Sequence, residues 1–399
     1  MAGFVRRWWK LPVGIVIGVA LGVSGYFLYS IRYAIKPAQT FELAPDLPSD
    51  ELANALFQAT GVELRPGHTV EVVYNGAAID RVIAEIDRAT RSIDVVMYIW
   101  EAGVASTRVT AALVARAKSG VVCRIVIDDL GSPNFNRDVK PALAEAGCSI
   151  YTFRPGTGID IAARNHRKLF VFDDQLAITG GLGIRDDWMG DGVHGSGWRD
   201  TSVVVTGPAV REAQQAFAEN WEEAGGSLLP ATELARPDPT GAIVAGFVSS
   251  TGSPVLTTAE RLTQLVIAVA HRRLWITNAY FAPSPAIIEL LRKKALAGVD
   301  VRILLPGDKS DVHTALMVGR EFYGTLREAG IRVWEYQPVM IHAKVMIADD
   351  DVSVIGSINL DPLSLNKLEE DAFIVKDTAT AAELARAFLE DVTHAKPID

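Results

Sequence analysis

Residues 117–128 read AKSGVVCRIVID, and residues 295–306 read ALAGVDVRILLP. Each segment predicts the last turn of a helix, a glycine that ends it and a buried strand. A further helix and strand precede each segment, at 82–98 in the first half and at 262–277 in the second. An Ala-Gly pair that ends another helix follows each segment, at 146–147 and at 329–330. Because helices alternate with short apolar strands, we expect an α/β sheet in each half. The repeat predicts two similar halves packed as a pseudo-twofold molecule with a cleft at the seam.

Each half also carries one copy of a polar motif with the pattern H-x-K-x4-D. The copies are His166, Lys168 and Asp173 in the first half and His342, Lys344 and Asp349 in the second. In both copies the first glycine of the next segment lies 14 residues after the histidine. Side chains two residues apart share one face of a strand, so two such strands across a seam point two imidazoles and two ammonium groups at one spot. Two copies of the motif with the same spacing from histidine to glycine indicate one shared functional site.

These side chains suit a phosphodiester substrate. Lys168 and Lys344 supply fixed positive charge for the phosphoryl oxygens without a metal ion. An imidazole can act as the nucleophile or as the acid that protonates the leaving alkoxide. A zinc site is disfavoured, because a lysine two residues from each histidine would repel the ion and no third ligand is evident. We therefore expect phosphoryl chemistry with no metal and no cofactor.

The charge balance narrows the substrate class. The 399 residues contain 39 Lys and Arg against 48 Asp and Glu, a formal net charge of −9. A protein that neutralises a nucleic-acid backbone needs a broad basic face, which this composition does not favour. Nucleic acid is therefore not expected as a partner.

The chain has only two cysteines, Cys123 and Cys148, which begin successive predicted strands. If those strands are neighbours in register, the two positions are offset by two residues, or about 6.6 Å along the strand. That offset is unfavourable for a disulfide, whose Cα atoms normally lie within about 6.8 Å of each other. We expect two free, buried thiols.

Residues 11–31 contain no charged side chain, and these 21 positions match the length of a membrane-spanning helix. A cleaved signal peptide is the alternative, but the apolar stretch is long for one and no A-x-A-like site follows. Three Lys or Arg precede the segment and two follow it, which favours a catalytic body outside the cytoplasm. Small residues recur every four positions in the segment and permit a homodimer through the helix, at Gly14, Gly18 and Gly22.

These patterns divide the chain into four parts. We expect a membrane anchor at 1–36, a linker and leading helix at 37–65, a first half at 66–235 and a second half at 236–399. The protein is then expected to cross the membrane once.

With these residues the chain resembles the phospholipase D superfamily, in which the H-x-K-x4-D motif occurs twice, and it is similar to bacterial cardiolipin synthases. The resemblance also rests on Arg164-Asn165 before the first motif, on 198–200 (Trp-Arg-Asp) and on 359–362 (Asn-Leu-Asp-Pro). It implies two phospholipase D-like α/β halves, which follow the predicted transmembrane helix, and a place in a bacterial cell membrane. It also implies a phosphatidyltransferase that acts on membrane phospholipids, phosphatidylglycerol or similar, through a phosphohistidine intermediate.

The resemblance implies roles for single residues. His166 is the expected nucleophile and His342 the general acid and later base, with the reverse assignment left open. Asp200 and Glu370 are expected to orient the imidazoles through their second nitrogen. Glu369 adjoins Glu370, so the register of that carboxylate is open by one residue.

Other motif positions are expected to bind substrate or to support the site. Asn359, Ser357 and Gly181 are the expected contacts to the substrate phosphate. Asp173 and Asp349 belong to the catalytic motif, and we expect them to orient the motif strands rather than to touch the substrate.

Two positions depart from the family pattern. The first half has Gly183 where the second half has Asn359, and Leu363 stands where cardiolipin synthases usually place an arginine. These departures leave the donor and the acceptor open. The alternatives are hydrolysis of phospholipid, a nuclease, or a non-catalytic membrane protein that has kept the fold.

Overall fold

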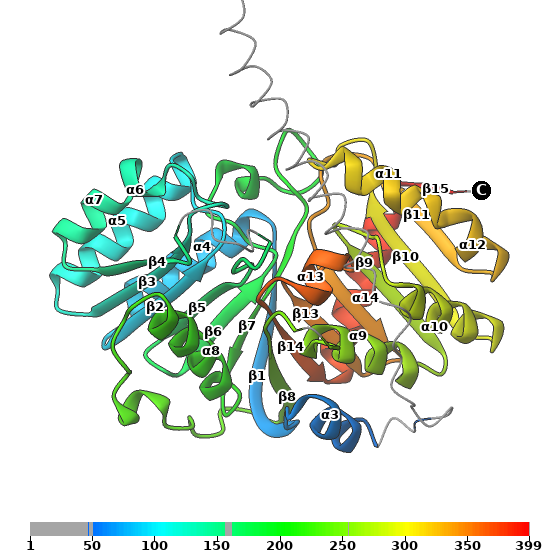
Figure 1. The fold of residues 1–399 in the computed structure, drawn as a ribbon, viewed down its shortest axis with the longest axis horizontal. Helices are drawn as coiled ribbons and strands as arrows, with labels where there is room; N and C mark the ends of the chain where they lie inside the picture. Colours follow the sequence, from blue (N-terminus) through cyan, green and yellow to red (C-terminus); the bar gives the residue numbers. More distant parts are fainter. Residues whose placement is uncertain (1–46, 48–50, 156–161, 254, 399) are drawn as a thin grey trace, which may run out of the picture.

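The computed structural model describes residue 47 and residues 51–155, 162–253 and 255–398. Two α/β halves lie side by side, and their strands form one sheet of 15 strands (Figure 1). The strand order is β15-β11-β10-β9-β12-β13-β14-β8-β1-β7-β6-β5-β2-β3-β4. The predicted membrane helix and its glycine face lie outside the described residues. Among the residues that are described, no helix is both long enough and apolar enough to cross a bilayer.

The first half follows a leading helix, α3 (Leu52–Thr60). Its strands are β1 (Arg65–Tyr74), β2 (Ser92–Met97), β3 (Val122–Asp128), β4 (Ser149–Phe153), β5 (Lys168–Phe172), β6 (Leu176–Gly180) and β7 (Thr201–Thr206). Its helices are α4 (Gly76–Arg88), α5 (Val104–Lys118), α6 (Phe135–Asp138), α7 (Lys140–Glu145) and α8 (Val210–Glu223), with short 3-10 helices η1 (Asp186–Met189) and η2 (Ala231–Leu234).

The second half repeats this order and adds a final strand. Its strands are β8 (Ile243–Ser250), β9 (Arg273–Asn278), β10 (Asp300–Pro306), β11 (Arg332–Tyr336), β12 (Lys344–Ala348), β13 (Val352–Gly356), β14 (Glu370–Lys376) and β15 (Ala395–Pro397). Its helices are α9 (Thr258–Val269), α10 (Pro285–Leu296), α11 (His313–Glu321), α12 (Tyr323–Glu328), α13 (Pro362–Asn366) and α14 (Thr378–Thr393).

The two halves have the same topology, which confirms the predicted repeat. The order β1-β7-β6-β5-β2-β3-β4 in the first half corresponds strand by strand to β8-β14-β13-β12-β9-β10-β11 in the second. Each half contains three neighbouring parallel strands, β2-β3-β4 in the first half and β9-β10-β11 in the second, while the added strand β15 is antiparallel to β11. The motif strand β5 or β12 runs antiparallel to its neighbours. Because helices connect the parallel strands, each half has the predicted α/β architecture.

Apolar packing joins the two halves into one body. Strand β1 pairs with β8 near their first residues, where Arg65 lies opposite Ala245. One buried cluster contains Phe217 of α8, from the first half, together with Phe247 of β8 and Phe388 of α14, from the second. Since this core crosses the junction, it holds the two motif strands in a constant relation to each other.

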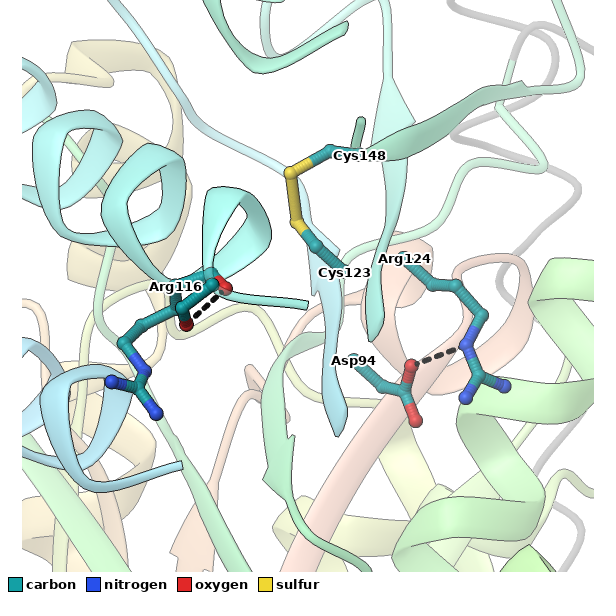
Figure 2. The surroundings of a disulfide bond; sticks show 6 residues. Asp94, Arg116, Cys123, Arg124 and Cys148 are labelled. Atoms are coloured by element: carbon teal, nitrogen blue, oxygen red, sulfur yellow. Dashed lines mark hydrogen bonds and ion pairs between the residues drawn. A yellow bond between two sulfur atoms is a disulfide. The ribbon is translucent and has the colours of Figure 1, made fainter. Parts of the chain in front are cut away.

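The prediction of two free thiols is wrong, because Cys123 and Cys148 form a disulfide (Figure 2). Strands β3 and β4 are parallel with Arg124 opposite Ser149, so the two preceding cysteines also lie opposite each other, with Cα atoms 4.6 Å apart. The predicted offset of two residues is absent. A strand's register depends on packing against its neighbours, and counting from the preceding glycines does not reveal it.

Candidate active site

The two histidines lie immediately before the strands that carry their motifs. Lys168 is the first residue of β5, opposite Met97 of β2, and Lys344 is the first residue of β12, opposite Asn278 of β9. The histidine backbones pair with the opposite half. The His166 N–H donates to the Glu369 carbonyl at 2.9 Å, and the His342 N–H donates to the Arg199 carbonyl at 2.7 Å.

Each imidazole is oriented by a carboxylate from the other half. Nδ1 of His166 lies 2.9 and 3.0 Å from the two carboxylate oxygens of Glu370, and Nδ1 of His342 lies 3.0 Å from Oδ2 of Asp200. All four side chains are buried. The adjacent Glu369 contacts Asn220 and other groups instead, so the carboxylate that meets the imidazole is Glu370.

The two carboxylates have different further partners. Glu370 accepts hydrogen bonds from the hydroxyls of Ser357 and Ser364. Asp200 accepts from the indole N–H of Trp188 and from the backbone N–H of Thr201, each at 2.7 Å. Ser364 and Trp188 were not among the residues predicted from the sequence. Ser364 follows the Asn-Leu-Asp-Pro segment, which was a usable signal, whereas nothing in the pattern around Trp188 indicates its contact.

The two lysines are buried beside the histidines. The ammonium of Lys168 donates to the His166 carbonyl at 2.6 Å and lies 5.2 Å from the ring of Tyr98. The ammonium of Lys344 donates to the His342 carbonyl at 2.5 Å. Burial lowers the pKa of Lys168 to about 7 and the pKa of Lys344 to about 8. The site therefore holds two desolvated cations whose charge an anionic ligand would stabilise.

The imidazoles are neutral near pH 7 in the free protein. Burial, reinforced by the lysine charges, lowers the pKa of His342 to about 4 and the pKa of His166 well below its usual value. With Nδ1–H directed at a carboxylate, each neutral ring has a lone pair on Nε2, to which no group in the described residues donates a hydrogen bond. Burial also raises the pKa of Glu370 to about 7. For Asp200, burial would raise the pKa, but the hydrogen bond from His342 and nearby positive charge hold it below its usual value.

The predicted phosphate contacts lie next to these pairs. Asn359 is buried, and its Oδ1 has no hydrogen-bond partner within the described part of the chain. The hydroxyl of Ser357 is used by Glu370. A Cβ atom at Gly181 would lie 2.3 Å from Oδ1 of Asp200, so the glycine leaves room for that carboxylate.

The motif aspartates are not brought to the histidines. Asp173 follows the last residue of β5 and accepts from the backbone N–H of Thr90 at 2.8 Å and of Ser92 at 2.9 Å. Asp349 follows β12 and accepts from the backbone N–H of Arg272 at 2.7 Å. Both carboxylates therefore tie the far end of a motif strand to the turn between a helix and the neighbouring strand.

One cluster of acidic side chains outside the site has oxygens close enough to share a cation. Carboxylate oxygens of Asp94, Asp174 and Glu233 lie within 4.8 Å of one another. Arg124 forms an ion pair with Asp94 (Figure 2) and another with Glu233. The Arg124–Asp94 distance is 3.1 Å. A guanidinium thus already supplies positive charge between these carboxylates.

A duplicated α/β fold with two carboxylate-oriented histidines and two buried lysines at its seam is typical of the phospholipase D superfamily. The family model described as "Cardiolipin synthase, PLD-like domain" matches residues 82–221 and 265–392, and the chain belongs to this family. The predicted resemblance to the superfamily and its cardiolipin synthases is confirmed.

Individual relatives and a solved structure agree with this assignment. The chain is 30% identical over 348 residues to cardiolipin synthase 1 of Bacillus cereus, which covers 83% of this chain and 67% of the relative. It is 32% identical over 336 residues to cardiolipin synthase A of Pseudomonas putida, and the match covers 82% of this chain and 69% of that relative. In fold it is similar to phosphatidylserine synthase of Haemophilus influenzae, with a TM-score of 0.64 and 12% sequence identity. That match covers 87% of this chain and 92% of the solved structure.

Proposed function

We propose that this chain is a phosphatidyltransferase of the cardiolipin synthase type, which moves a phosphatidyl group between phospholipids through a phosphohistidine. One observation carries the proposal. Two neutral imidazoles, each held by a carboxylate of the opposite half, keep Nε2 free beside two buried ammonium groups. This set of groups supplies a nucleophile, an acid and charge stabilisation for a phosphodiester without a metal ion.

In the first step Nε2 of His166 attacks phosphorus, and the phosphorus–oxygen bond to the departing alcohol breaks. His342 gives its Nε2 proton to that oxygen, while Lys168 and Lys344 stabilise the charge on the equatorial oxygens. An anionic phosphodiester favours the imidazolium form of His342 before reaction. Asp200, whose pKa is held low by the hydrogen bond from His342, supports the positive charge on that ring.

In the second step an acceptor alcohol gives its proton to Nε2 of His342, and its oxygen attacks phosphorus. The nitrogen–phosphorus bond to His166 breaks, and the product is again a phosphodiester. Asn359 and the two lysines contact the phosphate throughout. A phosphatidylglycerol or similar lipid supplies the phosphatidyl group and the acceptor hydroxyl.

The test is a double-mutant comparison with purified protein and phosphatidylglycerol, with lipid products resolved after incubation. His166→Ala and His342→Ala should each remove nearly all turnover, and the double variant should be hardly worse, because the two groups act in one reaction. His271→Ala is the matched control, since its backbone contacts Asp349 at the far end of the motif strand. Additive losses from the two histidines would contradict a shared reaction centre.

For the rest of the chain we propose a membrane anchor at 1–36, a linker with the leading helix at 37–65, and halves at 66–235 and 236–399. The catalytic body then lies outside the cytoplasm of a bacterial cell, with a homodimer formed through the anchor. The Cys123–Cys148 disulfide supports this side of the membrane, because disulfides persist in oxidising compartments.

Protease added to intact spheroplasts checks this orientation. The body should be digested without permeabilisation, while a cytoplasmic marker protein stays intact. Protection of the body until the membrane is permeabilised would reverse the proposed orientation. Recovery of the body in the periplasmic fraction that is set free when the spheroplasts are prepared would instead indicate a cleaved signal peptide.

A further inference from the structure

The surroundings of the two catalytic histidines are not equivalent. His342 lies among three aromatic rings, with ring centroids 5.3 Å away for Trp188, 5.2 Å for Trp198 and 6.0 Å for Tyr280. Near His166 the described residues show a single such ring, Tyr98, at 5.0 Å. The position beside His342 is therefore the more apolar of the two.

The asymmetry follows from the departure at Gly183. A Cβ atom at this position would lie 2.8 Å from the six-membered ring of Trp188, so any side chain here would collide with the indole. The equivalent residue of the second half is Asn359, whose Oδ1 has no partner within the described part of the chain. An indole thus fills the space of an amide in one half, while the other half keeps the amide.

Trp188 is also held rigidly in this place. It is fully buried, and its N–H donates to Oδ2 of Asp200 at 2.7 Å. The guanidinium of Arg185 lies 5.3 Å from the centroid of Trp188 and 4.8 Å from that of Trp198. Since the only polar atom of the indole is already used, the ring offers no hydrogen bond to a water molecule beside His342.

We propose that Trp188 is a specificity-determining residue that keeps water from the acceptor position beside His342, so that the phosphohistidine passes to a lipid alcohol. This inference rests on the proposed function. On the side of the aromatic rings an ordered water finds ring carbon instead of the two to four polar partners that it needs, whereas the hydroxyl of a lipid glycerol is carried by carbon atoms that can pack against those rings. Excluding water from a closed site is a recognised way of protecting a reactive intermediate from hydrolysis.

The two outcomes differ only in the acceptor. In transfer, an alcohol gives its proton to Nε2 of His342, its oxygen bonds to phosphorus and the bond to His166 breaks. In hydrolysis, water does the same and leaves a phosphatidic acid, a phosphomonoester. Because every other group is shared, the ratio of transfer product to phosphatidic acid measures the selection of the acceptor independently of the total rate.

The experiment measures this product ratio in the full-length protein with phosphatidylglycerol vesicles. Trp188→Ala removes the indole beside His342 and leaves room there for water. The share of phosphatidic acid should rise by about tenfold, which is the free-energy scale of binding one ordered water. Trp188→Phe keeps the ring but removes the N–H that binds Asp200, so total turnover should fall while the ratio stays at the wild-type value. Trp221→Phe, in the buried core of α8, is the matched control for loss of an indole donor.

A second variant covers the case in which Trp188→Ala does not fold. The pair Gly183→Asn with Trp188→Ala rebuilds the amide of the other half in the space that the indole leaves, and it should also raise the share of phosphatidic acid. An unchanged ratio in Trp188→Ala, or in the Gly183→Asn with Trp188→Ala pair, would overturn the role of Trp188. A wild-type protein that makes only phosphatidic acid would instead overturn the proposed transferase function, so the two failures are distinguishable.

Discussion

Removing the charge of the two orienting carboxylates should have unequal effects, because their other partners differ. In Glu370 both oxygens reach Nδ1 of His166, at 2.9 and 3.0 Å, and each also accepts from a serine hydroxyl. A hydroxyl can donate or accept, so the amide of Glu370→Gln keeps one acceptor for the imidazole while a serine reverses its role. The substitution therefore removes charge but leaves the hydrogen bond.

Asp200 has no such freedom. Its Oδ2 accepts from Nδ1 of His342 and from the indole N–H of Trp188, and its Oδ1 accepts from the backbone N–H of Thr201. The indole and the backbone amide are donors only. Either orientation of the amide in Asp200→Asn thus sets an NH2 against a fixed N–H, which leaves a buried donor unsatisfied or displaces the side chain.

The magnitudes follow from these contacts. A hydrogen bond to a charged group contributes about 1.5 to 3 kcal/mol and a neutral one about 0.5 to 1.5 kcal/mol. The retained but neutral hydrogen bond of Glu370→Gln is therefore weaker by about 1 to 1.5 kcal/mol, which should lower kcat by roughly 5- to 10-fold. An unsatisfied buried donor costs about 1 to 3 kcal/mol more, so Asp200→Asn should lose a further factor of roughly 10 to 100. Part of that second cost can appear as lower stability, so both kcat and the urea unfolding midpoint are to be measured.

The assay is lipid transfer by purified variants, with unfolding followed by circular dichroism. Glu369→Gln is the control, because this neighbour of Glu370 contacts Asn220 rather than a catalytic imidazole and should keep kcat near wild type. Equal losses of kcat and of stability in Glu370→Gln and Asp200→Asn would refute the reasoning from donor and acceptor roles.

Two further predictions concern stability and pH. Replacing Cys123 and Cys148 by alanine opens a loop of 25 residues and should lower the free energy of unfolding by about 3.5 kcal/mol in the loop-entropy model, measured by urea titration without reductant; a loss below about 1 kcal/mol would contradict that account. Burial lowers the pKa of Lys168 to about 7 and of Lys344 to about 8, so their charge is present at lower pH and is lost as pH rises through this range. The value of kcat/KM should therefore fall on the alkaline side, and Lys344→Arg, which stays charged, should retain more of its activity there than wild type does. A pH-independent kcat/KM from pH 6 to about 9 would show that these charges do not limit the reaction.

The sequence alone determined the architecture and the positions of the chemical groups. Helix stops, buried strands and the duplicated motif are local patterns, and local patterns predict local structure because side-chain periodicity reflects which face is buried. The repeat of 117–128 in 295–306 therefore predicted two like halves correctly. The two histidines, two lysines and both carboxylates were also found in this way or through the family resemblance.

Only the tertiary structure decided how these groups meet. His166 is paired with Glu370, 204 residues away, and His342 with Asp200, 142 residues away, so each half orients the imidazole of the other. The disulfide depends on the register between β3 and β4. The indole of Trp188 fits beside Gly183 only because glycine has no side chain. The physical reason is common to all three. Such contacts are set by how whole strands and loops pack around a shared core, and no spacing within a single segment records that packing.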